Sequence, residues 1–281
     1  MAITLPAAAQ LITLGNDLSL LQLDSGSFSA TLSLQGGQLL SFQPYGQQAW
    51  LYMSPQAVLQ PGKAIRGGVP VCWPWFGPHP SDNSAPAHGV ARQQNWQLLA
   101  VEQDGDAFHV KLQGPQWQGL SVQLHYTLAD CLDMQLHTHN NSTQAHTIST
   151  ALHSYLAVSD SRTISLGGLE NAVYEDKVAA RYSRMPAQPL QLQGEFDAIV
   201  YSEAAVVLSD PAWRRRLRIS REGSASVVLW NPWQDKAARL ADLPDDGWQD
   251  FVCIEAANAG EDSRLLQPGD SHVLHCRIQA D

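Results

Sequence analysis

Two isolated titratable residues in otherwise apolar, strand-like segments are the main candidates for chemistry in this sequence. Glu255 ends the apolar run 251–255, and His153 interrupts the run 149–157 of small and apolar residues. Burying a carboxylate without a partner is costly, so such a position calls for a cation, a ligand or a raised pKa. A glutamate at a solvent-facing strand end and a satisfied core histidine are the ordinary alternatives, and neither residue decides the question alone.

Other familiar signatures of chemistry are weak or absent. His137 and His139 form an HxH pair on one strand face, but no third ligand is near in sequence, so a solvated strand face is favoured over a metal site. The sequence contains no GxGxxG, no Walker-type phosphate loop, no GxSxG and no HExxH. Dinucleotide, nucleotide and zinc-protease chemistry are disfavoured accordingly.

Segment 62–80 breaks the pattern of its neighbours. It is too rich in glycine and proline for a regular element, yet it contains Trp73, Trp75 and Phe76. A loop with so many aromatic residues is costly to leave in water, so we expect it either to cap the core or to line a pocket.

The elements that must position these residues are short strands. In 120–128, alternate residues are apolar, as expected of a strand with one wet face. The same alternation, or a short apolar run between turn residues, predicts further strands at 28–34, 107–112, 132–136, 147–157, 204–208, 217–220, 225–230, 251–255 and 272–278. With no long amphipathic helix, linker or repeat, this pattern predicts an all-β fold, a large antiparallel β-sandwich, in a single domain spanning 1–281.

Composition restricts the partners. With 17 Lys and Arg against 27 Asp and Glu, the formal net charge is −10, which disfavours a nucleic-acid ligand. A site for an anionic substrate must therefore be built locally from a few arginines. Four scattered cysteines, a poor signal sequence and the lack of a long apolar run predict a cytoplasmic protein with no membrane partner.

An ordered set of motifs points further. The loop RGGVPVCWPWFG at 66–77 and HGVAR at 88–92 resemble the hexose-6-phosphate 1-epimerase branch of the aldose-1-epimerase (galactose mutarotase-like) family. Further matches follow in the family's order: ALHSY at 151–155, YEDK at 174–177, WNPW at 230–233 and VCIE at 252–255. The resemblance extends from about residue 36 to the C-terminus.

The resemblance implies a β-sandwich with a ligand cleft on one concave face and neither a metal ion nor an organic cofactor. It also implies an acid/base pair at His153 and Glu255, and substrate-binding positions at Arg66, His88, Arg92 and Asp197, with the two arginines at a phosphate. The chain departs from the family pattern at Ala198, Val200 and Val90, which leaves the pair intact and bears on sugar specificity. We expect a monomer that acts on a small-molecule sugar phosphate.

The chemistry of the residues agrees with this implication. Interconverting the α and β anomers of an aldose requires removal of the O1 proton and protonation of the ring oxygen, so one base and one acid suffice. Glu255 can take the first proton and protonated His153 can supply the second, while Trp73, Trp75 and Trp233 offer faces for the sugar's C–H surface. The alternatives are a mutarotase of non-phosphorylated aldoses and a non-catalytic carbohydrate-binding protein.

Overall fold

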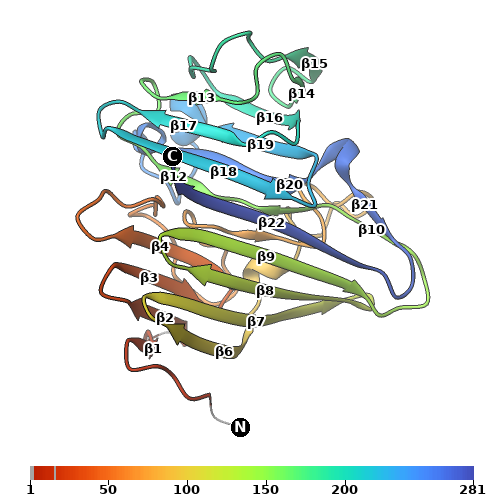
Figure 1. The fold of residues 1–281 in the computed structure, drawn as a ribbon. Coiled ribbons are helices and arrows are strands. Elements are labelled where there is room, and N and C mark those ends of the chain that lie inside the picture. The colour runs from red at the N-terminus through yellow and green to blue at the C-terminus, as the bar shows by residue number, and fades with distance from the viewer. Residues whose placement is uncertain (1–2, 16) are drawn as a thin grey trace.

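Two large antiparallel sheets form the body of the molecule, and the computed structural model describes residues 3–15 and 17–281. The first, here called the outer sheet, has the strand order β13-β17-β18-β22-β9-β8-β7-β6 (Figure 1). Its strands are β6 (Gln97–Asp104), β7 (Ala107–Trp117), β8 (Leu120–Leu128), β9 (Cys131–Asn140), β13 (Ser165–Gly167), β17 (Val206–Asp210), β18 (Arg215–Glu222) and β22 (Ser271–Ala280).

The second sheet, here called the cavity sheet, has the order β15-β14-β16-β19-β20-β11-β5, and β12 also pairs with β20. Its strands are β5 (Val71–Cys72), β11 (Thr150–Leu152), β12 (Tyr155–Ala157), β14 (Val173–Asp176), β15 (Arg181–Arg184), β16 (Phe196–Tyr201), β19 (Ser226–Asn231) and β20 (Phe251–Asn258).

Smaller elements complete the chain. An N-terminal sheet, at the lower left of Figure 1, contains β1 (Ala9–Thr13), β2 (Ser19–Asp24), β3 (Phe28–Ser33) and β4 (Gln38–Pro44). A two-stranded sheet pairs β10 (His146–Ile148) with β21 (Arg264–Leu266). The helices are α1 (Trp233–Ala237) and the 3₁₀ turns η1 (Ala91–Gln93), η2 (Gly247–Asp250) and η3 (Gly260–Asp262). Among the described residues, no helix could span a bilayer.

The period-two pattern explains how the sheets pack. In β8 every second residue is buried, from Leu120 to Leu128, while the residues between them are half-buried. One continuous hydrophobic cluster joins Leu124 of the outer sheet, Leu229 and Ile254 of the cavity sheet and Leu32 of the N-terminal sheet. Burying a large aliphatic side chain contributes about 1.5–3 kcal/mol of stability. The hydrophobic effect in this shared interior is therefore the main interaction that holds the sheets together.

The predicted all-β antiparallel architecture is confirmed, because every pairing between the described strands named above is antiparallel. β8 spans the predicted range, and the four cysteines are free and buried. The predicted strand 147–157 is wrong in one respect: it is divided into β10, β11 and β12. The chain changes partners there, since β10 pairs with β21 whereas β11 and β12 pair with β20.

Candidate active site

The alternation of β20 places Glu255 on the face of the cavity sheet that is turned away from the main core. Val252, Ile254 and Ala256 enter the main hydrophobic cluster. The residues between them point to the opposite face, where Cys253 packs in a second apolar cluster and Glu255 reaches a cavity. A glutamate in a strand that is buried throughout thus lies on the floor of a pocket, with only 1% of its surface exposed.

His153 reaches the same floor from the neighbouring chain segment. Leu152 pairs with Ala256 and Tyr155 pairs with Cys253, so continuing this register sets His153 opposite Glu255. Side chains directly opposite one another on neighbouring strands meet closely. The His153 Nε2 and Glu255 Oε1 atoms are 3.3 Å apart, and the imidazole stacks on the Tyr155 ring at 4.8 Å between centroids.

Burial opposes the charged form of both members of this pair. It raises the pKa of Glu255 well above its ordinary value, and the nearby Asp197 carboxylate adds to the rise. It lowers the pKa of His153 well below its ordinary value, and the positive charges of Arg66 and Arg92 act in the same direction. Paired acids and bases whose environments shift them in opposite directions are typical of catalytic sites.

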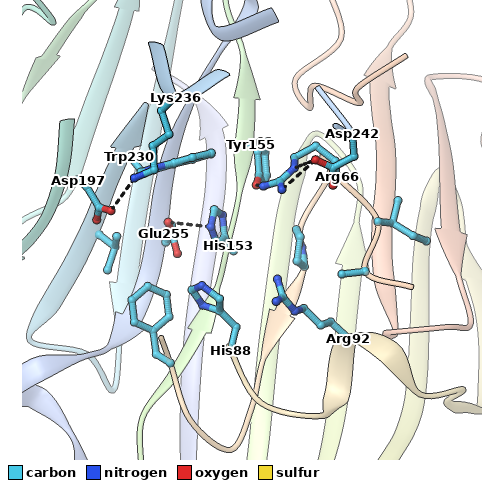
Figure 2. Close-up of a pocket in the computed structure, with 15 residues that line it drawn as sticks. Arg66, His88, Arg92, His153, Tyr155, Asp197, Trp230, Lys236, Asp242 and Glu255 are labelled. Atoms are coloured by element: carbon cyan, nitrogen blue, oxygen red, sulfur yellow. Dashed lines mark hydrogen bonds and ion pairs between the residues drawn. The ribbon is translucent and has the colours of Figure 1, made fainter. Parts of the chain in front are cut away.

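The cavity around the pair has a volume of about 220 Å³ and is lined by charged and apolar side chains. Figure 2 shows His153, Glu255 and His88 at its centre, Arg66 and Arg92 towards one end, and Asp197 and Lys236 towards the other. The full lining is Ala64, Ile65, Arg66, Pro70, Phe76, His88, Arg92, His153, Tyr155, Asp197, Val228, Trp230, Lys236, Asp242 and Glu255. The structure therefore brings together the predicted residues Arg66, His88, Arg92, His153, Asp197 and Glu255.

Arg66 and Arg92 form the cationic end of the cavity. Arg66 donates from Nη1 to the Tyr155 hydroxyl at 3.0 Å and from Nε to the Asp242 carboxylate at 3.2 Å. Arg92 donates from Nη2 to the Ala87 carbonyl at 2.8 Å, and its Nε is buried without a hydrogen-bond partner among the described residues. Two guanidinium groups held by the protein at one end of a pocket suit an anionic ligand.

His88 is held in one orientation by its own loop. Its Nδ1 accepts a hydrogen bond from the Gly77 backbone N–H at 3.3 Å, so the neutral ring carries its proton on Nε2. Burial, together with Arg92 and Arg66, lowers the pKa of His88 to about 3. His88 thus remains neutral and presents a fixed N–H donor near His153, whose ring centroid is 6.0 Å away.

Asp197 and Lys236 form the opposite end. Asp197 of β16 lies opposite Trp230 in the register of the sheet, and Lys236 comes from α1. The Lys236 Nζ is 2.8 Å from the Glu195 carboxylate and 3.7 Å from that of Asp197. Burial raises the pKa of Asp197, while Lys236 opposes the rise. This end offers both an acceptor and a donor for hydroxyl groups.

Trp73, Trp75 and Trp233 were predicted to stack on the sugar, but none of them lines the cavity. Trp73 is fully buried and donates to the Thr138 hydroxyl at 3.1 Å, while buried Trp75 donates to the Pro86 carbonyl. Trp233 packs on Trp248 at 4.3 Å. All three therefore pack against the hydrophobic cluster rather than line the cavity. Trp230 and Phe76 supply its aromatic surface instead.

Nine lining residues were not among the predicted site residues, and the aromatic and charged ones among them are Phe76, Tyr155, Trp230, Lys236 and Asp242. Tyr155 and Trp230 lie within the motifs 151–155 and 230–233, and Phe76 lies within 66–77, so the motifs themselves could have suggested them. Lys236 of α1 and Asp242 of the segment after α1 follow the motif 230–233, where the sequence carries no comparable signal.

The HxH pair lies away from the cavity. His137 and His139 are half-buried residues of β9 in the outer sheet, and His139 Nδ1 is 2.8 Å from the Ser271 hydroxyl. The predicted wet strand face fits this placement, since neighbouring Leu136 and Thr138 point into the interior.

Comparison with known proteins shows which family this sequence resembles. The model of the aldose 1-epimerase family matches residues 19–279. An Escherichia coli (strain K12) protein named "Putative glucose-6-phosphate 1-epimerase" is 31% identical over 268 residues, which cover 92% of this chain and 89% of the relative.

Solved structures agree on the fold. The crystal structure titled "putative mutarotase (YeaD) from Salmonella typhimurium" has a TM-score of 0.91 at 26% identity and covers 99% of this chain and 95% of its own. A galactose mutarotase-like protein from Clostridium acetobutylicum has a TM-score of 0.71 at 13% identity, covering 97% and 98%, and supports the fold alone.

Proposed function

Because the chain belongs to the aldose 1-epimerase family, we propose that it interconverts the α and β anomers of hexose 6-phosphates, with His153 and Glu255 as its acid/base pair. The observation that carries the proposal is the buried pair itself, with Nε2 and Oε1 3.3 Å apart on the floor of a polar cavity. A protein that only bound a sugar would have no use for two mutually opposed titratable groups in a site where burial penalises the charge of each.

The reaction needs the pair to hold one proton in total. Glu255 as carboxylate takes the proton of the O1 hydroxyl, protonated His153 gives its proton to O5, and the C1–O5 bond breaks as the C1=O1 bond forms. Rotation about the C1–C2 bond then presents the other face of the aldehyde. Ring closure returns the O5 proton to His153 and the Glu255 proton to O1, so the pair ends as it began.

Burial and mutual attraction act in opposite directions on the two arrangements of that proton. Desolvation disfavours the ion pair, whereas attraction between charges 3.3 Å apart favours it. The neutral pair and the ion pair are the two states that the cycle alternates between. A site that opposes the desolvation of the charges with their mutual attraction lowers the cost of each transfer.

The phosphate preference is supported by the cationic end of the cavity. Arg66 is anchored by Asp242 and Tyr155, and Arg92 retains a buried Nε without a partner among the described residues. With a sugar C1 at the His153–Glu255 pair, this end would receive the 6-phosphate, while Asp197 and Lys236 would contact ring hydroxyls. Both arginines must act at close range, because the net charge of −10 repels a dianion.

The test is an exchange experiment with magnetisation transfer between the anomers of glucose 6-phosphate, run in parallel with glucose and galactose. We expect exchange well above the spontaneous rate for the phosphosugar and a smaller effect on the neutral sugars. Faster exchange of a neutral aldose would favour the alternative, a mutarotase of free sugars. Saturable binding of a sugar without faster exchange between its anomers would favour the other alternative, a non-catalytic carbohydrate-binding protein.

A further inference from the structure

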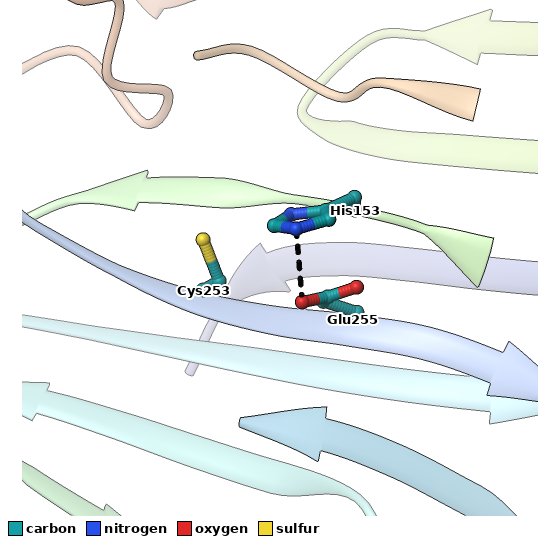
Figure 3. A group of neighbouring side chains, drawn as sticks. All are labelled: His153, Cys253 and Glu255. Atoms are coloured by element: carbon teal, nitrogen blue, oxygen red, sulfur yellow. Dashed lines mark ion pairs between the residues drawn. The ribbon is translucent and has the colours of Figure 1, made fainter. Parts of the chain in front are cut away.

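A third potential ligand atom lies beside the acid/base pair. Cys253 is two residues before Glu255 on β20, so its side chain points to the same face of the sheet. Figure 3 shows the Cys253 thiol beside the His153–Glu255 pair, with Cys253 and Glu255 on the same strand and His153 on the neighbouring segment. One ligand atom from each residue lies within 4.8 Å of the other two, and all three residues are buried.

The spacing of these atoms is close to that around a metal ion. Zinc binds histidine nitrogen and carboxylate oxygen at about 2.0–2.2 Å and thiolate sulfur at about 2.3 Å in a tetrahedral arrangement. Two such bonds at a tetrahedral angle separate a nitrogen from an oxygen by about 3.3 Å, and His153 Nε2 and Glu255 Oε1 are 3.3 Å apart. The sulfur would need to approach by only about 1 Å.

The carboxylate is also uncommitted apart from its contact with His153. Both Glu255 oxygens are buried without a hydrogen-bond partner among the described residues, and Oε1 lies 3.3 Å from His153 Nε2. Buried polar atoms are nearly always satisfied, so two unsatisfied carboxylate oxygens beside an imidazole nitrogen mark a site that can receive a ligand. The substrate accounts for the face that opens to the cavity, but the anomerisation mechanism does not use the Cys253 thiol.

We propose that His153, Cys253 and Glu255 form a site for a divalent cation of the zinc class, and that an ion bound there inhibits the enzyme by occupying the acid/base pair. The inhibitory part rests on the proposed function, whereas the metal site itself does not. The cavity is lined by His153 and Glu255, so water could supply a fourth ligand from that side, as in a three-ligand zinc site.

The ligand set selects the class of metal. A nitrogen, a sulfur and an oxygen donor suit Zn²⁺, Co²⁺ and Cd²⁺, whereas Mg²⁺ and Ca²⁺ require oxygen ligands throughout. A thiolate and a carboxylate together cancel the charge of a divalent ion, which makes the complex tolerable in a buried site. On binding, the thiol proton of Cys253 and the proton held by the His153–Glu255 pair both leave to solvent, and lone pairs of the sulfur, the His153 Nε2 and a Glu255 oxygen form the bonds to the metal.

Binding is tested with Co²⁺, whose thiolate complexes absorb in the near-ultraviolet and visible, and with Cd²⁺, whose thiolate band lies at shorter ultraviolet wavelengths. The wild-type protein should bind one equivalent of either ion with a metal–thiolate band. Cys253→Ala should lack that band and bind more than about tenfold more weakly, since even partners outside the ligand shell are worth about 10- to 100-fold in metal affinity. Cys131→Ala, which removes a thiol from the outer sheet, is the matched control and should behave as wild type. An unchanged band in Cys253→Ala, or no band in the wild type, would overturn the site.

Inhibition is tested on the anomers of glucose 6-phosphate with Zn²⁺ in a thiol-free buffer. Zn²⁺ should abolish exchange in the wild type and EDTA should restore it, while Mg²⁺ should have no effect. Cys253→Ala should keep the basal rate and require at least about tenfold more Zn²⁺ for the same inhibition. Equal sensitivity of the two proteins would refute inhibition through this site. If the wild type showed no exchange at all, the proposed function would fail, and the metal–thiolate band would still decide whether the site exists.

Discussion

Glu255 shows how function at a single residue opposes stability. Its carboxylate is buried, its oxygens accept no hydrogen bond from the described residues, and its nearest cationic candidate is a histidine that burial also keeps neutral. A fold selected for stability alone would place an apolar or amide side chain there. The cost is retained at the position where the proposed proton transfer takes place.

This cost predicts a pH-dependent gain in stability for Glu255→Gln. Burial raises the pKa of Glu255, so below the ordinary glutamate pKa of about 4.3 the carboxyl is protonated in both states and costs little. As the pH rises, the unfolded state ionises first and the wild type loses stability that the amide variant keeps. Denaturant unfolding should find Glu255→Gln more stable by about 1–2 kcal/mol at pH 7, with the difference shrinking towards pH 4. A variant less stable than wild type at pH 7 would mean that an ion pair with His153 stabilises the fold.

The arginines predict a selective effect on phosphosugars. Charge-assisted contacts to a phosphate are worth about 1.5–3 kcal/mol each. Arg92→Ala should therefore weaken the binding of glucose 6-phosphate by about tenfold or more. The same change should barely alter the response to glucose, and inorganic phosphate should compete with the phosphosugar. Arg66→Ala should act in the same direction with an added loss, since Arg66 also holds Tyr155 and Asp242. Steady-state kinetics on both sugars measures this, and equal losses on both would place the arginines at ring hydroxyls instead.

Part of the site could be predicted from the residue types in the sequence. His153 and Glu255 stand out because each interrupts an apolar strand, and Arg66 and Arg92 because their motifs match a family. The prediction that the tryptophans stack on the sugar was wrong for a physical reason. A loop can keep its aromatic rings out of water by burying them in the protein interior, as it does with Trp73, and then they line no pocket. Lys236 and Asp242 could not be predicted, because only the folded path of the segment after β19 brings them to the cavity.

At the scale of elements, the loop between β5 and η1 positions His88. The next residue, Gly89, has a φ of 76°, and a Cβ there would lie 2.0 Å from the Trp73 carbonyl oxygen. The close approach lets Val90 donate its N–H to that same carbonyl at 2.9 Å and locks the loop against β5. Only glycine permits this contact, so the orientation of His88 depends on it.

Two glycines of this loop form a matched pair for testing that dependence. Gly77 has a φ of 74°, like Gly89, but a Cβ added at Gly77 would meet nothing within 4 Å. Alanine at either position should cost about 1–2 kcal/mol of backbone strain. Gly89→Ala should cost about 1–3 kcal/mol more and lower the anomerisation rate by displacing His88. Thermal unfolding and exchange rates of the two variants compare these effects, and equal behaviour would show that the close approach does not position the loop.

The positions of strands could be predicted from the period-two pattern where one face of the strand is exposed to water and the other is buried, as in β8. It failed across 147–157, where consecutive residues are buried on both faces and period two disappears. The divisions between β10, β11 and β12 arise from a change of partners, which is tertiary information. The division before Tyr155 is also where His153 enters the cavity, so the site lies where the sequence pattern is least regular.

At the scale of the whole molecule, the sheets share one interior. Residues of the N-terminal sheet, the outer sheet and the cavity sheet belong to one hydrophobic cluster. We therefore expect a single cooperative unfolding transition, with tryptophan fluorescence and far-ultraviolet circular dichroism changing at the same denaturant concentration. Separate transitions would indicate that the N-terminal sheet or one face of the sandwich folds independently, against the predicted single domain.

The central claim is that the buried His153–Glu255 pair transfers protons to and from a sugar. The most direct measurement is the rate of exchange between the α and β anomers of glucose 6-phosphate, with wild-type protein and with Glu255→Gln at equal concentration. We predict a loss of about 10²–10⁴-fold in the variant, together with the unchanged or increased stability expected of a folded protein without the buried carboxylate. Exchange by Glu255→Gln at close to the wild-type rate would contradict the account.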